Sequence, residues 1–162
     1  MKIGVLSDTH IPSRTKKLPD VVMDTLKNVD YIVHAGDINE ISVITALERL
    51  APVIAISGNT DSNELKQALG ESKIFTLGGM KFGLCHGHGV KSNTLGRVVN
   101  NFKDIMLDCI IFGHSHIPYC KHMNDTLFFN PRSPADKRRN EMYSFGILEI
   151  ESVICPHIIY FR

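Results

Sequence analysis

The sequence predicts an α/β fold in which two mixed β-sheets pack face to face, with helices on their outer sides. Through residue 57, short apolar runs alternate with amphipathic helical segments, the pattern of parallel strands joined by right-handed crossovers. After residue 112 the helical signal disappears and strand-like segments follow one another. With 162 residues, the chain has the length of about one domain, so we expect a single domain spanning residues 1–162.

The first part of the chain predicts a β-α-β-α-β unit. Its apolar runs each end in small and polar residues, as buried strands do where they lead into loops. The segments between these runs carry apolar residues at helical spacing. The predicted elements are strands at 2–6, 31–35 and 53–57 and helices at 20–28 and 42–50.

The second part of the chain predicts mainly strands. Gly78-Gly79 lies between two apolar runs and indicates a hairpin turn. The last four strands are expected to be consecutive and antiparallel, and the loop 131–141, the most polar and basic segment, is expected to be mobile. The elements, in order, are a hairpin at 73–77 and 80–85, a helix at 92–102, and strands at 109–112, 119–123, 126–130, 142–149 and 152–160.

Composition and charge exclude several classes of protein. Lys and Arg number 18 against 17 Asp and Glu, a net charge of +1, which is too balanced for a protein that coats nucleic acid or an anionic membrane. The longest apolar stretch, 153–161, is interrupted by Pro156 and His157 and is far shorter than the ~20 residues that span a bilayer. The N-terminus has no apolar core of a signal peptide, so we expect a cytoplasmic protein.

Metal-binding residue types follow five of the predicted strands. Four of the eight histidines lie between residues 86 and 116. Strand ends meet at the carboxyl edge of an α/β sheet, so residues that are distant in sequence converge there. Carboxylate, imidazole and amide ligands favour Mn, Fe, Mg, Ni or Zn, and seven of them suit two ions roughly 3.5–4 Å apart that share a carboxylate. The candidate ligands are Asp8, His10, Asp37, Asn59, His86, His114 and His116.

In order, these motifs match the five blocks of the calcineurin-like metallophosphoesterase family. They are Asp8-Thr9-His10, Gly36-Asp37, Gly58-Asn59, His86 and Gly113-His114-Ser115-His116. The chain resembles the small bacterial and archaeal phosphodiesterase branch of that family over residues 1–131. The resemblance implies a four-layer αββα sandwich and a dinuclear centre, with Mn as the first choice of metal. It also implies that Asp8, His10, Asp37 and His116 hold the first ion, that Asp37 bridges, and that Asn59, His86 and His114 hold the second.

The activity implied by the resemblance is hydrolysis of a small phosphodiester. A bridging hydroxide, available near neutral pH because the ions lower the pKa of water, would attack phosphorus. The alternative is a non-catalytic protein-interaction scaffold, as in the retromer-subunit relatives of the family. A scaffold does not need seven intact ligands, which favours the enzyme. The apolar C-terminal strand and the resemblance also make a homodimer an open expectation.

Two positions depart from the family pattern. Thr60 stands where the wider family usually has a histidine that contacts phosphate, and threonine supplies no proton at neutral pH. This weakens the expectation of general-acid catalysis and discourages phosphomonoesterase activity. Arg132 stands where the branch commonly has glycine, and its guanidinium is expected either to bind phosphate or to point to solvent.

Each of the remaining candidate residues has a functional or a structural interpretation. His88, two residues after His86, is a candidate proton donor and substrate ligand. Asp61 is grouped with Thr60 and His88 at the catalytic rim, where it orients Asn59 or caps the following helix. Asn59 and Arg132 are candidate substrate ligands. His34 is expected to be structural, and the basic run 137–139 is expected to be a solvated loop or a contact for an anionic substrate.

Overall fold

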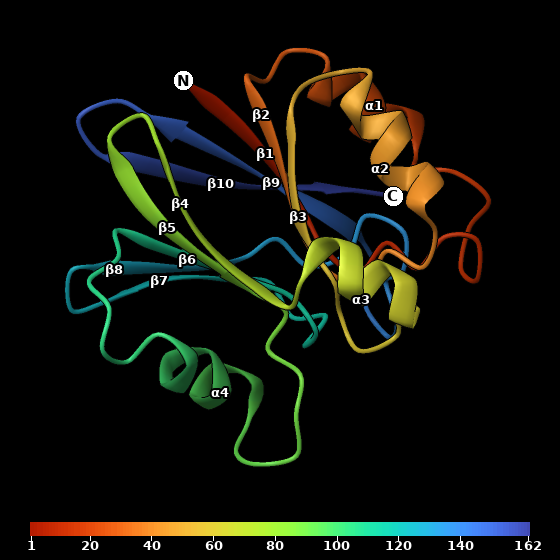
Figure 1. The fold of residues 1–162 in the computed structure, drawn as a ribbon. Coiled ribbons are helices and arrows are strands. Elements are labelled where there is room, and N and C mark those ends of the chain that lie inside the picture. The colour runs from red at the N-terminus through yellow and green to blue at the C-terminus, as the bar shows by residue number, and fades with distance from the viewer.

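The computed structural model describes residues 1–162 and contains two five-stranded sheets packed face to face (Figure 1). The strand order is β10-β9-β1-β2-β3 in the first sheet and β4-β5-β6-β8-β7 in the second. The first sheet comprises β1 (Lys2–Leu6), β2 (Tyr31–Ala35), β3 (Val53–Ile56), β9 (Tyr143–Ile150) and β10 (Ile154–Phe161). The second comprises β4 (Ser72–Leu77), β5 (Met80–Cys85), β6 (Cys109–Phe112), β7 (Tyr119–Met123) and β8 (Thr126–Asn130).

The first sheet contains the predicted β-α-β-α-β unit. β1 pairs in parallel with β2, and β2 with β3. The helices α1 (Asp20–Leu26) and α2 (Ile41–Glu48) pack on the outer face of this sheet, where Leu26 and Leu47 are fully buried (Figure 1). Both faces of β1 and β2 are therefore covered, which explains their almost continuous apolar sequence.

The second sheet is covered on its outer face by α4 (Thr94–Asn101), whose Val98 packs against Phe112 and Phe128. The short helix α3 (Asn63–Leu69) follows β3. Between the sheets lies a continuous apolar core that includes Phe82 and Phe129. The layers are thus helix, sheet, sheet and helix, which confirms the predicted four-layer αββα sandwich.

The predicted pairing of the last four strands is wrong in one respect. β7 and β8 form an antiparallel hairpin in the second sheet, and β9 and β10 form another in the first sheet. β8 and β9 do not pair, because the chain crosses between the sheets, and β8 pairs in parallel with β6 instead. The second sheet is consequently built entirely from residues 72–130, while the first sheet uses both ends of the chain.

The crossing segment differs from the mobile loop that its polarity predicts. Residues 131–136 are buried, and only 137–141 are exposed. The Ser133 hydroxyl donates to the Asp8 carbonyl (2.6 Å) and accepts from the backbone N–H of Asp136 (2.7 Å). These bonds satisfy polar groups that would otherwise need hydrogen bonds to water. None of the four helices has the length and apolar character that a membrane crossing requires.

Candidate metal centre

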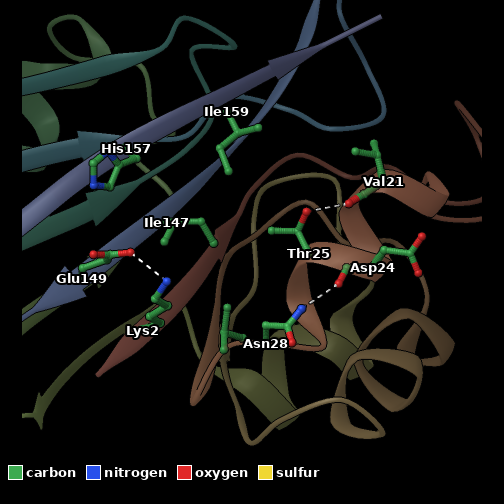
Figure 2. Close-up of a pocket in the computed structure, with 10 residues that line it drawn as sticks. Lys2, Val21, Asp24, Thr25, Asn28, Ile147, Glu149, His157 and Ile159 are labelled. Carbon is green, nitrogen blue, oxygen red and sulfur yellow. Dashed lines mark hydrogen bonds and ion pairs between the residues drawn. The ribbon is translucent and has the colours of Figure 1, made fainter.

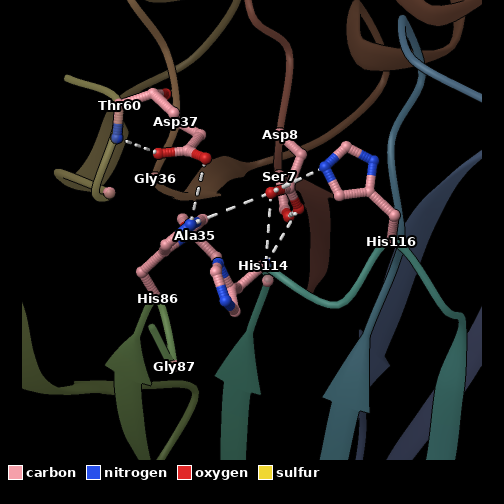
Figure 3. Close-up of polar contacts among 12 residues, drawn as sticks. Ser7, Asp8, Ala35, Gly36, Asp37, Thr60, His86, Gly87, His114 and His116 are labelled. Carbon is pink, nitrogen blue, oxygen red and sulfur yellow. Dashed lines mark hydrogen bonds and ion pairs between the residues drawn. The ribbon is translucent and has the colours of Figure 1, made fainter. Parts of the chain in front are cut away.

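Several of the predicted ligands converge where strands of the two sheets end, as Figure 3 shows for Asp8, Asp37, His86, His114 and His116. Asp8 and Asp37 follow β1 and β2 of the first sheet, whereas His86 and His116 follow β5 and β6 of the second. The backbones of these loops are joined by hydrogen bonds, from Asp8 N–H to the Gly36 carbonyl (2.9 Å) and from His10 N–H to the Asp37 carbonyl (3.0 Å). The strand ends therefore hold their side chains in a fixed relation.

The backbone turns sharply at the ligand positions. A positive φ is uncommon for residues other than glycine and collects at functional sites, where the surrounding structure holds it. Backbones of this kind occur at Asp8 (54°), His10 (47°), Asp37 (58°), His114 (66°) and His116 (51°). Gly58 is required beside them, because a Cβ at this position would collide with Oδ1 of Asp37. The local backbone is thus shaped around the two carboxylates.

Asp8, His10 and His116 form the first close group of potential metal ligands, and all three are buried. The Nε2 atoms of the two imidazoles lie 3.4 Å apart, and His116 Nε2 lies 3.4 Å from Oδ1 of Asp8. The two rings are stacked, with centroids 5.4 Å apart. Three donor atoms therefore converge on one point.

Asp8, Asp37 and His86 form the second close group, which shares Asp8 with the first. Nε2 of His86 lies 3.2 Å from Oδ2 of Asp37 and 3.9 Å from Oδ1 of Asp8. The same Oδ2 of Asp37 lies 3.6 Å from Nε2 of His10. Both carboxylates thus lie between the two sets of histidines, and each is within reach of both.

The orientation of the imidazoles fits a metal ion. Nδ1 of His86 donates to the Ala35 carbonyl (2.7 Å), and Nδ1 of His116 donates to the Asp136 carbonyl (3.3 Å). These bonds leave Nε2 of each ring free to face the carboxylates, as metal-binding histidines usually do. Nε2 of His86 is buried and has no well-aligned hydrogen-bond partner, although it is at ion-pair distance from Asp37. Such a nitrogen, among carboxylate oxygens, suits a borderline divalent cation.

The ionisation of the centre follows from this packing. Burial lowers the pKa of His86, but the close contact with Asp37 and the charge of Asp8 outweigh it and raise the pKa to about 9. Burial raises the pKa of Asp37, but the contact with His86 and the Thr60 backbone lower it overall, well below its usual range. The pKa of His10 is lowered, mainly by burial. Because metal binding requires deprotonated ligands, cations and protons compete here.

Thr60 and Asp61 hold the loops of the centre by hydrogen bonds. Thr60 bonds to the carboxylate of Asp37, and Asp61 accepts from backbone N–H groups. The backbone N–H of Thr60 donates to Oδ1 of Asp37 (2.9 Å), and its hydroxyl donates to Asn39 (2.9 Å). Asp61 accepts from the N–H groups of Ile38 (2.8 Å), Asn39 (2.6 Å) and Gly58 (2.7 Å). It does not cap the following helix, because Ser62 does so through a bond from Leu65 N–H.

The other predicted ligands lie at the margin. The Asn59 side chain is exposed and makes no hydrogen bond, so its place on a metal stays a prediction. His114 lies beside the second group, with its ring 5.2 Å from that of His86, and its backbone N–H donates to Asp8 (3.1 Å). The ring of His88 lies 5.6 Å from that of His86 and 6.4 Å from that of His114. The pKa of both marginal histidines is lowered, first by burial and then by the charge of His86.

His34 is fully buried and bonds within its own surroundings. Its Nε2 lies 3.1 Å from the Thr9 hydroxyl, and its Nδ1 accepts from Gly36 N–H (3.2 Å). Burial lowers its pKa to about 3, so the ring is neutral. This contact pattern agrees with the structural role expected from the sequence.

Arg132 does not point to solvent, and its role as a phosphate ligand stays a prediction. The residue is 2% exposed, and Nη2 of its guanidinium donates to the Lys137 carbonyl (2.9 Å). It therefore supports the exposed turn from within. Arg138, the central residue of the basic run, reaches the centre instead, with its Nη2 3.1 Å from Nε2 of His116. Sequence reasoning missed Asp136, the carboxylate that directly precedes the basic run 137–139.

A separate pocket of about 950 Å³ lies between α1 and the outer face of β9 and β10 (Figure 2). Its charged groups are paired with one another or with neighbours: Lys2 with Glu149 (3.0 Å), and Asp24 with Lys27 (2.7 Å). It holds no converging set of metal ligands. The chemistry-bearing residues thus gather at the sheet ends and not in this pocket.

The fold and the centre together define a class, an αββα sandwich with a buried carboxylate and imidazole site at its strand ends. The sequence model of the calcineurin-like phosphoesterase superfamily domain matches residues 1–153, and the chain belongs to this family. The family binds divalent metals and acts on phosphoesters, and the protein is accordingly a hydrolase of this type.

Individual relatives agree with this assignment. A protein of Methanothermobacter thermautotrophicus named "Probable metallophosphoesterase" is 35% identical over 138 residues, which cover 85% of this chain and 80% of that protein. A phosphodiesterase of Methanocaldococcus jannaschii is 31% identical over 145 residues, 81% of this chain and 82% of the relative.

Two solved structures are similar over almost their full length. The structure of an archaeal phosphodiesterase has a TM-score of 0.79 at 26% identity and covers 99% of this chain and 100% of that one. The structure of Vps29 complexed with Zn²⁺, from Entamoeba histolytica, has a TM-score of 0.77 at 25% identity and covers 100% of both chains.

Proposed function

We propose that this protein is a metal-dependent phosphodiesterase that uses two divalent ions, with Mn as the first choice, to hydrolyse a small phosphodiester. The observation that carries this proposal is the pair of buried ligand groups that share Asp8. Two overlapping groups suit two neighbouring ions, whereas a single ion would leave part of the set without a function. The likeness to phosphodiesterases in sequence and in fold supports the same activity.

The role of each ligand residue follows from its position in the centre. Divalent ions, when bound, lower the pKa of water and offset the charge of phosphoryl oxygens. His10 and His116 would hold the first ion with Asp8, and His86 would hold the second with Asp37. Asp37, whose Oδ2 faces His10 and His86, would be the carboxylate shared by both ions. Thr60 N–H fixes the orientation of this carboxylate.

His88 is the candidate proton donor for the leaving group, and its lowered pKa favours the protonated, donating form only below neutral pH. Its half-buried ring lies beside the second ligand group, and its Nδ1 is buried without a hydrogen-bond partner. Thr60 lies on the opposite side, near His10, with its hydroxyl already donated to Asn39. Because Thr60 supplies no cation, the site is better suited to a singly charged diester than to a doubly charged monoester.

The similarity to Vps29 structures fits the alternative function, a non-catalytic protein-interaction scaffold. Vps29 structures have TM-scores of 0.77, 0.80 and 0.87 at 25%, 24% and 18% identity, and the archaeal phosphodiesterase has 0.79 at 26%, so similarity of fold does not separate the two interpretations. A protein-binding scaffold also has no need for two overlapping buried groups of carboxylates and imidazoles. The intact centre therefore favours the enzyme.

The test is hydrolysis of bis(p-nitrophenyl) phosphate compared with p-nitrophenyl phosphate, with Mn²⁺ and with a chelator. We expect hydrolysis of the diester to exceed that of the monoester, to require metal, and to be lost in Asp8→Asn. His122→Ala, which removes an exposed histidine on β7, is the matched control and should keep full activity. A protein that binds two Mn²⁺ ions yet hydrolyses neither ester would overturn the proposed activity.

A further inference from the structure

We propose that Arg138 is a substrate-binding residue that contacts a phosphoryl oxygen at the first metal position, and that Asp136 positions it there. This inference rests on the proposed function, because it assigns a ligand to the anionic group of the same substrate. The evidence is the geometry of the exposed turn 137–141, which lies over His116.

The guanidinium of Arg138 is placed at the metal ligands and still open to solvent. Its Nη2 lies 3.1 Å from Nε2 of His116, the atom that also faces Asp8 and His10. Its side chain is 52% exposed. A metal held by His116 would use the lone pair of Nε2, so the Nη2 donor would then be free for the next anionic atom. That atom is an oxygen of a phosphate bound at the same position.

Asp136 organises the surroundings of this arginine through its carbonyl and both carboxylate oxygens. Its carbonyl accepts from Nδ1 of His116 (3.3 Å), and its Oδ1 accepts from the backbone N–H of Arg138 (3.0 Å). Its Oδ2 lies 3.3 Å from Nε of Arg138 and 3.2 Å from Nε of Arg14. The carboxylate is 8% exposed, whereas the side chains of Arg14 and Arg138 are 56% and 52% exposed. One residue thus couples a metal ligand to two guanidinium groups.

The charges at this point favour an anion. Arg14 and Arg138 carry two positive charges, and the single carboxylate of Asp136 neutralises only one of them. Arg14 follows His10 in a turn closed by its own N–H to the His10 carbonyl (2.9 Å), so its backbone is fixed at the rim. Arg138 and Arg139 line a small pocket of about 380 Å³ together with His114 and His116.

The backbone at Arg138 is held in place by hydrogen bonds to the preceding residue, Lys137. Nη2 of the buried Arg132 donates to the Lys137 carbonyl, directly before Arg138 in the chain. The backbone N–H of Asn140 donates to the same carbonyl (2.9 Å), which closes the turn. A guanidinium that is held in place loses less conformational entropy on binding than a free one. A planar guanidinium also matches phosphate better than an ammonium does.

The test is titration of the Mn-loaded protein with inorganic phosphate, using Arg138→Ala, Arg138→Lys and Asp136→Asn. Arg49→Ala is the matched control, because it removes an exposed arginine at the end of α2 that lines no part of this pocket. We expect unchanged binding of Mn²⁺ in Arg138→Ala and a phosphate Kd weakened about tenfold, as for the loss of one charged hydrogen bond. Arg138→Lys should recover part of this loss, and Arg49→Ala should stay within about twofold of the wild type.

Steady-state kinetics with bis(p-nitrophenyl) phosphate distinguish a residue that contacts the substrate, Arg138, from one that positions it, Asp136. For Asp136→Asn we expect a higher KM with nearly unchanged kcat, because the arginine remains present but is less well held. Wild-type affinity for phosphate in Arg138→Ala would overturn the proposal. So would an equal loss in Arg49→Ala, loss of Mn²⁺ in Arg138→Ala, or a wild type that binds no phosphate. A wild type that binds Mn²⁺ and phosphate but hydrolyses nothing refutes only the proposed phosphodiesterase activity.

Discussion

Asp61 is expected to be the strongest structural support of the centre, although it contacts no predicted ligand side chain. Its carboxylate is 4% exposed and accepts three backbone N–H groups. Two of these, from Ile38 and Asn39, belong to the loop after Asp37, and the third, from Gly58, precedes Asn59. We therefore choose Asp61→Asn, which preserves shape and removes only charge and accepting capacity.

The magnitude follows from the three bonds. If the amide oxygen introduced by Asp61→Asn keeps the bonds from Ile38 and Asn39, the new NH₂ group faces Gly58 N–H, donor against donor, at a separation that is 2.7 Å in the wild type. A hydrogen bond to a charged group contributes about 1.5–3 kcal/mol, and the two remaining bonds weaken by about 1 kcal/mol each when the charge is lost. Relief from burying a carboxylate offsets part of this sum. We expect a net loss of about 2–4 kcal/mol in the free energy of unfolding.

Urea unfolding in the presence of a chelator measures this loss without a contribution from bound metal. With a slope of about 1–3 kcal/mol per molar urea, the midpoint should fall by about 1–2 M. Asp104→Asn, at an exposed aspartate that makes no hydrogen bond, is the control and should change stability by less than about 0.5 kcal/mol. An unchanged midpoint and slope in Asp61→Asn would refute the reasoning.

Three further predictions concern the ligands and the rim. Asp37→Ala should reduce turnover of a diester more than His10→Ala does, because Asp37 faces both ligand groups; equally mild losses would contradict the bridging role. In a chelator, protonated His86 stabilises the fold: this contribution is complete below the ordinary pKa of 6.5 and is lost as pH rises through about 9, so unfolding free energies measured across this range should fall. His86→Gln should remove that part of the pH dependence, and its persistence would assign it to another group. Thr60→His should raise hydrolysis of p-nitrophenyl phosphate, most strongly below neutral pH where more imidazole is protonated; a variant that keeps both metals without any gain would show that this side chain does not face the leaving group.

The sequence predicted the elements and the acidic and imidazole ligands because their signals are local. A buried strand, a small residue and a ligand such as Asp8 or Asp37 occur within a few positions of one another. The partners of the last four strands were not predictable in the same way, since β8 pairs with β6 across a change of sheet. The place of Arg138 also depends on contacts with Asp136 and His116 that no spacing reveals. The polarity of residues 131–136 predicted a mobile loop, but this segment is buried and its polar groups form hydrogen bonds inside the protein.

The path of the chain between the sheets has a consequence for how the two halves stay together. Residues 72–130 form the whole second sheet as one insertion between β3 and β9. Each close ligand group combines two residues that follow strands of the first sheet with one histidine from this insertion: His116 in one group and His86 in the other. An ion in either group is therefore a cross-link between host and insertion, and it must leave before the sheets separate. The rate at which the ion dissociates consequently sets an upper limit on the rate at which the metal-loaded protein separates its two sheets in a subglobal unfolding step.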